Sequence, residues 1–252
     1  LSPQFYLFGP ITLTSVDEET GEEIVVYEES RTWQIANDAP VAYPGGVSAG
    51  ITGWFKADAG VFSDSGCSTV ITDLDASDDD AGCWQDQSGN GNDAIWSGTG
   101  SEQPDLKADI INFNRVLDFD AAEQDNLRIA SDLGLVGTTD FAVYTVFQSN
   151  AAGTTRALLG SESPTPGGFQ LFQSSITNAL DSNTNGSSVV SGSTDITGGI
   201  HIGSAVRDES DNWSVQLDGR IDGEVNSTQS ITSRNKSIGE TYDVLHWDDD
   251  IA

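Results

Sequence analysis

The feature that most constrains the fold of this chain is a series of short β-prone runs separated by clusters of Gly, Asn, Asp and Ser, with no long stretch at helical spacing. Many short strands without crossover helices are typical of antiparallel sandwiches. The pattern therefore predicts an all-β chain folded as an antiparallel β-sandwich or jelly roll. The runs predicted as strands are residues 51–56, 116–119, 127–129, 141–148, 157–160, 168–173, 200–206, 213–217, 224–226, 236–238 and 244–247.

Three regions of this pattern carry further detail. Residues 141–147 form the most continuous apolar run, which predicts a central strand covered on both faces. An Asp-Gly pair at positions 218 and 219 lies between two β-prone runs and predicts a tight hairpin turn. Residues 174–197 are rich in Ser, Thr, Asn and Gly, and we expect loops and short edge strands there.

The N-terminal part of the chain has a different character. Residues 11–16 and 24–27 are β-rich and flank an acidic turn, which predicts a β-hairpin, and a third short run follows at 32–35. Residues 1–10 are apolar and aromatic, and we expect them to pack on another surface. Because residues 37–46 contain two Pro and two Gly, they are predicted to form a linker. The expected organisation is thus a hairpin segment or arm at 1–43 and a sandwich at 44–252.

The charge balance excludes several kinds of partner. Forty Asp and Glu against ten Lys and Arg give a formal net charge of −30, so an extended phosphate-binding surface is excluded, and with it nucleic acid and anionic membranes. No apolar run reaches the length of about 18 residues that a membrane helix needs, so we expect no membrane insertion. The acidic residues lie mostly in turns. They are either a solvated surface or, in part, ligands for a divalent cation. The chain begins without Met, and we expect it to be a processed product or a segment of a longer protein.

A turn rich in oxygen atoms follows Trp84. The stretch from Cys83 to Ala94 is predicted to be the end of a strand with a buried Trp, followed by a Ser-Gly-Asn-Gly-Asn-Asp turn. Two interpretations stay open, a calcium site or a turn whose side chains bond their own backbone. The predicted metal ligands are Asp86, Asn90, Asn92 and Asp93, with Asp118 and Asp120 as further oxygen donors.

The two cysteines, Cys67 and Cys83, flank a stretch rich in Gly, Ser and Asp. No His or further Cys lies nearby to complete a zinc site, so we expect a disulfide between them. A disulfide would place the protein outside the cytoplasm, in an extracellular or cell-surface setting.

Several segments resemble the laminin-G-like, concanavalin A-like jelly-roll domains of large secreted bacterial surface proteins. Residues 44–61 resemble the family's opening "PGGV…LWLKADAGV", residues 84–94 match "W-x-D-x-S-G-N-G-N-D-A", and residues 116–127 are similar to "V-x-F-D-G…D-x-L". Later matches follow in the family's order at 141–147, 157–160, 214–219 and 247–252. The resemblance covers about residues 44–252, and it implies sugar-binding, adhesive or architectural roles without fixing which.

The sequence departs from this family pattern at both ends. Residues 1–43 lie outside the resemblance, and family members continue past "D-G-D-I-A" with a core strand "E-V-I", whereas this sequence stops at Ala252. The resemblance therefore implies a sheet with an open slot that could accept a strand from another segment or another copy, the apolar arm at 1–10 being the candidate.

The sequence contains no catalytic signature. The β-glucanases that share this superfold use Glu-x-Asp-x-x-Glu, and residues 123–128 and 209–214 begin this pattern but lack its final Glu. The two histidines, His201 and His246, lie in or beside β-prone runs and are expected to be structural. We therefore expect a protein that is not an enzyme.

Sugar binding commonly uses an aromatic ring that stacks on the sugar, with nearby polar groups that bind hydroxyls. The predicted ligand-binding aromatics, all next to loops, are Trp96, Trp213, Tyr242 and Trp247, whereas Trp54 and Trp84 are predicted to lie in the core. The expected function is a non-catalytic extracellular binding or adhesion module for a glycan or cell-surface ligand, with calcium as its cofactor. The alternatives are a structural subunit that assembles with its own copies by strand donation, and a glycan-active enzyme.

Overall fold

The computed structural model describes residues 11–16, 23–29, 47, 49–72, 79–98, 102–150, 152–161, 168–184, 187–241 and 245–252. These residues contain strands, turns and loops but no helix, and accordingly no helix that would be long and apolar enough to cross a membrane. The chain divides into two compact units, Leu1–Gly46 and Val47–Ala252. The predicted boundary between residues 43 and 44 lies outside the described residues.

The first unit contains the predicted hairpin. Strand β1 (Ile11–Val16) pairs antiparallel with β2 (Glu23–Glu29), and the register shifts between Leu13 and Thr14. The apolar arm at 1–10 and the short run at 32–35 lie outside the described residues.

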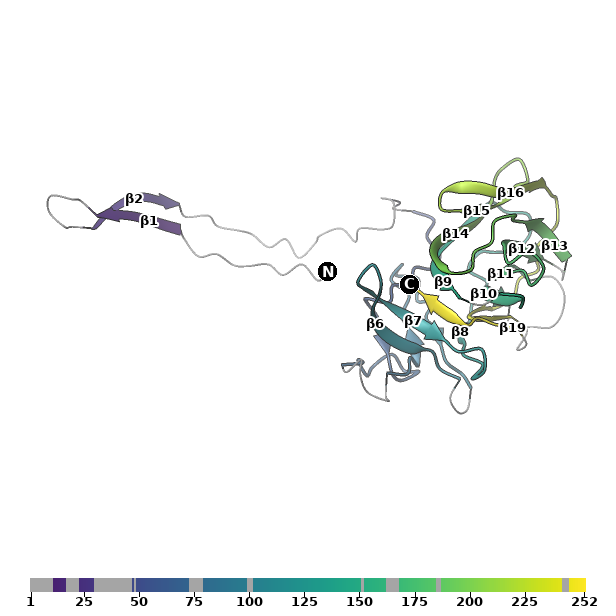
Figure 1. Cartoon of the computed structure of the whole chain (residues 1–252), viewed down its shortest axis with the longest axis horizontal. Coiled ribbons are helices and arrows are strands. Elements are labelled where there is room, and N and C mark those ends of the chain that lie inside the picture. Colours follow the sequence, from purple (N-terminus) through teal and green to yellow (C-terminus); the bar gives the residue numbers. More distant parts are fainter. Residues whose placement is uncertain are drawn as a thin grey trace. The chain divides into compact units, whose positions relative to one another are not determined.

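The second unit is an antiparallel β-sandwich of the predicted jelly-roll class (Figure 1). Its larger sheet has nine strands. In spatial order they are β13 (Ser187–Ser191), β12 (Leu180–Thr184), β11 (Gln170–Gln173), β10 (Arg156–Ser161), β17 (Lys236–Ile238), β8 (Leu127–Ile129), β5 (Ala94–Ile95), β4 (Cys83–Trp84) and β3 (Val61–Phe62).

The opposite sheet has seven strands. In spatial order they are β16 (Arg220–Asn226), β15 (Asn212–Leu217), β14 (Gly199–Arg207), β9 (Phe141–Ser149), β20 (Asp249–Ile251), β7 (Asn114–Phe119) and β6 (Asp105–Ile111). A separate pair, β18 (Glu240–Thr241) and β19 (Leu245–His246), completes the fold. Neighbouring strands are antiparallel throughout both sheets.

Side chains from both sheets form one hydrophobic core. In the seven-stranded sheet, Leu117, Phe119 and Phe147 point into it, and Phe147 meets Trp247 edge to face with ring centroids 5.5 Å apart. Successive side chains of a strand point to opposite faces, so Asp118 and Tyr144 lie on the other side of this sheet. We call that side, which is turned away from the core, the outer face.

The alternation of inward and outward side chains shows that one prediction about β9 is wrong. The strand at 141–147 is central in its sheet but is not covered on both faces, because Tyr144 is 67% exposed. The composition of this run does not show which of its side chains are buried. Only the alternation of positions along the strand distinguishes the inward residues from Tyr144. Residues 51–56 were predicted as a strand and form only an isolated bridge between Lys56 and Ala59.

Strand β20 occupies the place where the sequence indicated an incomplete sheet. It inserts between β7 and β9, pairing Asp249 with Phe119 and Ile251 with both Leu117 and Phe147. The amide of Ala252 donates to the Val146 carbonyl at 3.0 Å. On that side of β9, none of the described residues pairs with positions 141–145.

Candidate functional site

The turn after β4 is held together by the carboxylate of Asp86. Its Oδ1 accepts hydrogen bonds from the amides of Trp54 (2.9 Å) and Ser88 (2.8 Å). Its Oδ2 accepts bonds from Ser88 Oγ (2.7 Å) and the Asn92 amide (3.1 Å). Burial opposes ionisation of Asp86, but the bonds from Ser88, Trp54 and Asn92 outweigh it and lower the pKa.

These contacts do not fit a calcium ion held by the predicted ligands. Calcium takes about six to eight oxygen ligands. The Asp86 oxygens are already used, and Asn90 and Asn92 turn their amide nitrogens to the carbonyls of residues 51 and 52, at 2.8 and 2.7 Å. Asp93 accepts the Asp86 amide at 2.9 Å. The other two predicted ligands, Asp118 and Asp120, lie in and just after β7 of the opposite sheet, away from the strand that carries this turn.

The predicted disulfide is present between Cys67 and Cys83. Cys83 lies in β4 and is fully buried, and Trp84 beside it belongs to the core as predicted, whereas Trp54 is half-buried. The disulfide joins the loop after β3 to the start of the Asp86 turn. It therefore fixes the edge of the nine-stranded sheet.

Two of the four aromatics predicted to bind a ligand do not reach the surface. Trp213 and Trp247 are fully buried in the core, and the Trp213 ring nitrogen donates to Ser182 Oγ at 3.2 Å. A buried ring has no face free for a sugar, so both assignments are corrected. Trp96 is half-buried and packs against the core, and Tyr242 lies outside the described residues.

One group of exposed aromatic and aliphatic side chains lies instead on the outer face. Tyr144 of β9 is joined there by Val146 on the same strand and by Ile200 and Ile202 on β14, whose register pairs Ile202 with Val146. Sequence reasoning missed Tyr144 because it treated its strand as fully covered. The signal that would have found it is the position of Tyr144 between Val143 and Thr145, out of phase with the inward Phe141 and Phe147.

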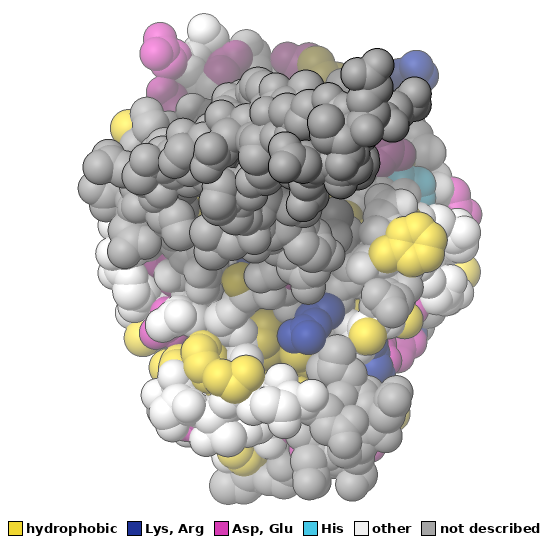
Figure 2. Space-filling view, turned by 90° about the vertical axis from the view of Figure 1, so that its left-hand side faces the viewer, with side chains coloured by type: hydrophobic (Ala, Val, Ile, Leu, Met, Phe, Trp, Pro, Cys, Tyr) yellow, Lys and Arg dark blue, Asp and Glu magenta, His cyan; other side chains and the backbone are white. Residues whose placement is uncertain are grey.

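Next to this group is a partly open hollow of about 660 Å³. It lies where β9, β14, the turn between β6 and β7, and the segment before β3 come together. Its lining residues are Phe55, Lys56, Ala57, Asp58, Ile111, Asn112, Asn114, Arg115, Val146, Ile200, His201, Ile202, Asp218 and Ala252. On the face that Figure 2 presents, hydrophobic side chains form several small groups with basic, acidic and uncharged polar ones between them.

One wall of the hollow is a fixed polar pair. The predicted Asp-Gly turn joins β15 to β16, with Asp218 and Gly219 at φ 50° and 78°. Asp218 accepts the Ile202 amide at 2.9 Å and lies 2.9 Å from Nδ1 of His201. Burial opposes ionisation of Asp218, but its bonds to Ile202 and His201 prevail and lower the pKa. His201 is therefore part of the hollow as well as of the strand.

The opposite wall carries Arg115, whose guanidinium is exposed and forms no ion pair with any residue of the described parts of the chain. Asn112 and Asn114 flank it, and Lys56 is already paired with Asp58 at 3.2 Å. The lining of the hollow thus combines apolar side chains, the exposed guanidinium of Arg115 and several amide and carboxylate groups.

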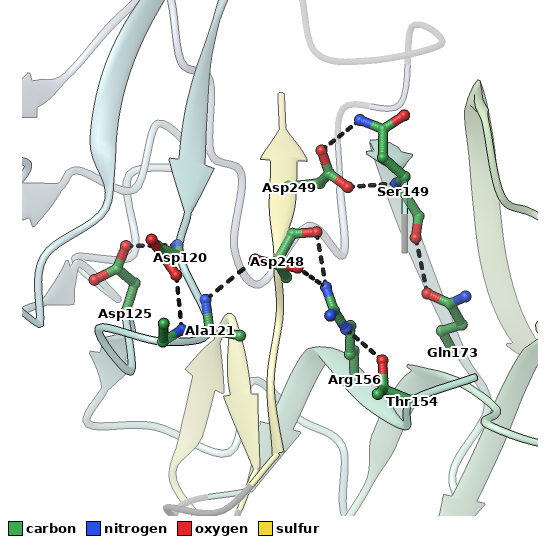
Figure 3. A network of polar contacts seen from close by, with 11 residues as sticks. Asp120, Ala121, Asp125, Ser149, Thr154, Arg156, Gln173, Asp248 and Asp249 are labelled. Carbon is green, nitrogen blue, oxygen red and sulfur yellow. Dashed lines mark hydrogen bonds and ion pairs between the residues drawn. The ribbon is translucent and has the colours of Figure 1, made fainter. Parts of the chain in front are cut away.

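A polar network anchors β20 beside the hollow (Figure 3). Asp248 pairs with Arg156 of β10, which links the two sheets, and Asp249 binds Asn150 through both its side-chain and backbone nitrogens. Next to it, Ser149 donates to Gln173 at 2.8 Å across the core. These contacts hold the short strand in place although it pairs over only a few residues.

No protein-family model matches the chain, and no curated protein matches it. Solved structures similar to it include the binding domain of Paraclostridial Mosquitocidal Protein 1, at TM-score 0.48 and 9% identity over 67% of this chain and 45% of that one. A botulinum neurotoxin type C structure, described for cell entry through two ganglioside molecules, gives TM-score 0.45 and 14% identity over 62% and 39%. The carbohydrate-binding module CBM66 from Bacillus subtilis gives 0.35 and 14% over 59% and 87%. The chain spans less than half of the first two structures.

Proposed function

We propose that the sandwich is a non-catalytic binding module that holds a glycan at the hollow and against the neighbouring Tyr144 of the outer face. The observation that carries this proposal is the 67% exposure of Tyr144 in the middle of a strand, beside a hollow lined by the exposed guanidinium of Arg115. An exposed ring on a rigid strand offers a flat apolar surface at low entropic cost.

The chemistry of the hollow suits a sugar. Ligand pockets commonly enclose about 300–1,000 Å³ and combine apolar walls with a few polar groups that fix orientation. Here Val146, Ile200 and Ile202 supply the apolar part, and the His201–Asp218 pair supplies hydrogen-bonding groups for hydroxyls. Because none of the described carboxylates pairs with Arg115, its guanidinium favours a glycan that carries an acidic group.

We further propose that the module works outside the cytoplasm, at a cell surface or in the extracellular medium. The disulfide between Cys67 and Cys83 supports this, since disulfides persist in oxidising compartments. The partner would then be a glycan or another cell-surface ligand.

A glycan array followed by calorimetry on the best ligand tests the proposal. Tyr144→Ala should weaken binding about tenfold, the loss expected when one stacked ring is removed. Phe113→Ala is the matched control, because Phe113 is 89% exposed at the tip of the β6–β7 turn and does not line the hollow. An array without signal, with and without calcium, or equal effects of the two variants, would contradict the proposal.

The edge of β9 favours a second candidate function, a subunit that assembles with its own copies. Positions 141–145 have no partner on the β20 side among the described residues, and an unpaired edge can accept an extended segment. Sizing of the full chain over a range of concentrations tests this. A monomer throughout would count against it.

A further inference from the structure

A row of oxygen-bearing side chains crosses the outer face from β6 to β9. The register pairs Asp105 with Asp118 and Asp118 with Asp250. Because Ile251 pairs with Phe147, the next position on β9, Gln148, lies beside Asp250. Residues opposite each other on neighbouring strands share a face and have Cβ atoms about 4.5–5.5 Å apart. Three carboxylates and one amide are therefore side by side.

One end of this row already has its counter-charge. Lys107, also on the outer face of β6, lies 2.5 Å from Asp105 Oδ2 and 3.7 Å from Asp79 Oδ2. Carboxylate oxygens of Asp79, Asp80 and Asp105 lie within 4.8 Å of one another. The ammonium group of Lys107 therefore supplies the positive charge that this cluster requires. A metal ion at that end would have to displace the lysine.

The other end of the row has no such partner. Asp250 is only 7% exposed. Its carboxylate lies near the charges of Asp118, Asp249 and Lys107 and receives no hydrogen bond from the described residues. Asp118, its neighbour in the row, is half-buried and likewise receives no hydrogen bond from the described residues. Two neighbouring carboxylates that are shielded from water and lack hydrogen-bond donors are unfavourable unless a bound cation or proton neutralises them.

We propose that a divalent cation of the calcium type binds on the outer face between Asp118 and Asp250. The amide oxygen of Gln148, which lies beside Asp250 in the row, is a further protein ligand, and water completes the set. Hard cations prefer carboxylate and amide oxygens, and calcium accepts irregular arrangements that magnesium does not. The site differs from the Asp86 turn, whose oxygens are already used.

Titration of the metal-free full chain with CaCl₂, by calorimetry and by thermal melting, tests the site without any glycan. We expect saturable binding and a rise in the melting midpoint of about 5 °C at saturating calcium. Asp250→Asn and Asp118→Asn should each lose this rise. In chelator each should melt at or above the wild-type midpoint, because one of two repelling carboxylates has been removed.

The matched control is Glu224→Gln, an exposed carboxylate on β16 of the same sheet, which should keep the full response. Magnesium at the same concentration should shift the midpoint less. A wild-type chain that ignores calcium, or a response that survives both aspartate variants, would overturn the proposal. A wild-type chain without a calcium response would mean that bound protons alone neutralise the carboxylates of the row. A response that survives both variants would mean that calcium binds elsewhere.

Discussion

Asp125 is a buried carboxyl whose environment favours the neutral form. It is 3% exposed in the loop between β7 and β8, where its Oδ2 accepts the Asp120 amide at 2.7 Å and its Oδ1 has no hydrogen-bond partner among the described residues. Burial is the main cause that raises the pKa of Asp125 to about 8, and the charges of Glu123, Asp120 and Asp105 add to it. At neutral pH the folded protein therefore keeps a proton here that the unfolded chain releases.

This proton gives the first prediction at the residue scale. Above the ordinary Asp pKa of 3.8 the unfolded chain is ionised, so Asp125 makes folding less favourable as the pH rises, up to its folded pKa of about 8. Asp125→Asn mimics the neutral form and should remove up to ~1.4 kcal/mol per pH unit of this slope. Denaturant unfolding at several pH values between 4 and 8 measures this slope, with Glu224→Gln, an exposed carboxylate remote from Asp125 in the sheet order, as control. Parallel pH profiles for wild type and Asp125→Asn would contradict the assignment.

The aromatic residues show what the sequence can and cannot say at this scale. Trp84 was placed in the core because it ends a strong strand pattern, and it is buried. Trp213 and Trp247 are predicted to bind a ligand because they lie next to loops, yet a side chain next to a loop still points inward when its position in the strand faces the core. The same alternation of faces turns Tyr144 outward. Whether a side chain is buried depends on the face of the sheet to which it points. Its distance from a loop in the sequence does not predict burial.

At the scale of elements, the disulfide closes the loop between β3 and β4. Its cysteines are 16 residues apart, a loop whose closure stabilises a fold by about 3 kcal/mol in the chain-entropy model. The double variant Cys67→Ala/Cys83→Ala should therefore melt about 6–12 °C lower. A reductant should lower the wild-type midpoint similarly and leave the variant unchanged. Equal midpoints for oxidised and reduced wild type would show that the loop is ordered without the bond.

Strand boundaries were predicted well where local signals are strong. The predicted strands at 127–129 and 236–238 coincide with β8 and β17, and the Asp-Gly turn joins β15 to β16. Strand β6 was missed, because Asp105, Lys107 and Asp109 make its sequence look like a polar loop. Lys107 pairs with Asp105 and Asp79 on the assembled sheet, and the sequence pattern alone does not reveal these pairs. The segment at 51–56 has the composition of a strand, but the Trp54 amide bonds to the Asp86 turn instead of to a ladder.

At the scale of the whole molecule, the fold class follows from the sequence and the candidate sites do not. Many short runs without helical periodicity are enough to indicate an antiparallel sandwich. The hollow and the carboxylate row combine residues far apart in the chain, such as Asp105 and Asp250, that meet only through strand register. Register depends on the packing of the entire sheet, so these sites could not be predicted from local patterns.

The last prediction concerns the dependence of the sandwich on the N-terminal unit. Among the residues whose side chains are described, the buried members of the hydrophobic core run from Ala57 to Ile251. If the sandwich is a self-contained binding module, deletion of residues 1–46 should leave its melting midpoint and its monomeric state unchanged. Strand donation makes the opposite prediction: the apolar arm would fill the edge of β9 at 141–145, so its removal should lower the midpoint and dissolve any oligomer.

A second deletion, of residues 1–10 alone, separates the arm from the hairpin. We expect it to behave like the full chain in calorimetry and in sizing with light scattering, because Phe141 and Val143, the apolar inward residues of the open edge, already pack against the core. A lower midpoint in both deletions would assign the stabilising contact to the arm. A lower midpoint only in the longer deletion would assign it to residues 11–46. Either result would favour assembly over the free-standing module.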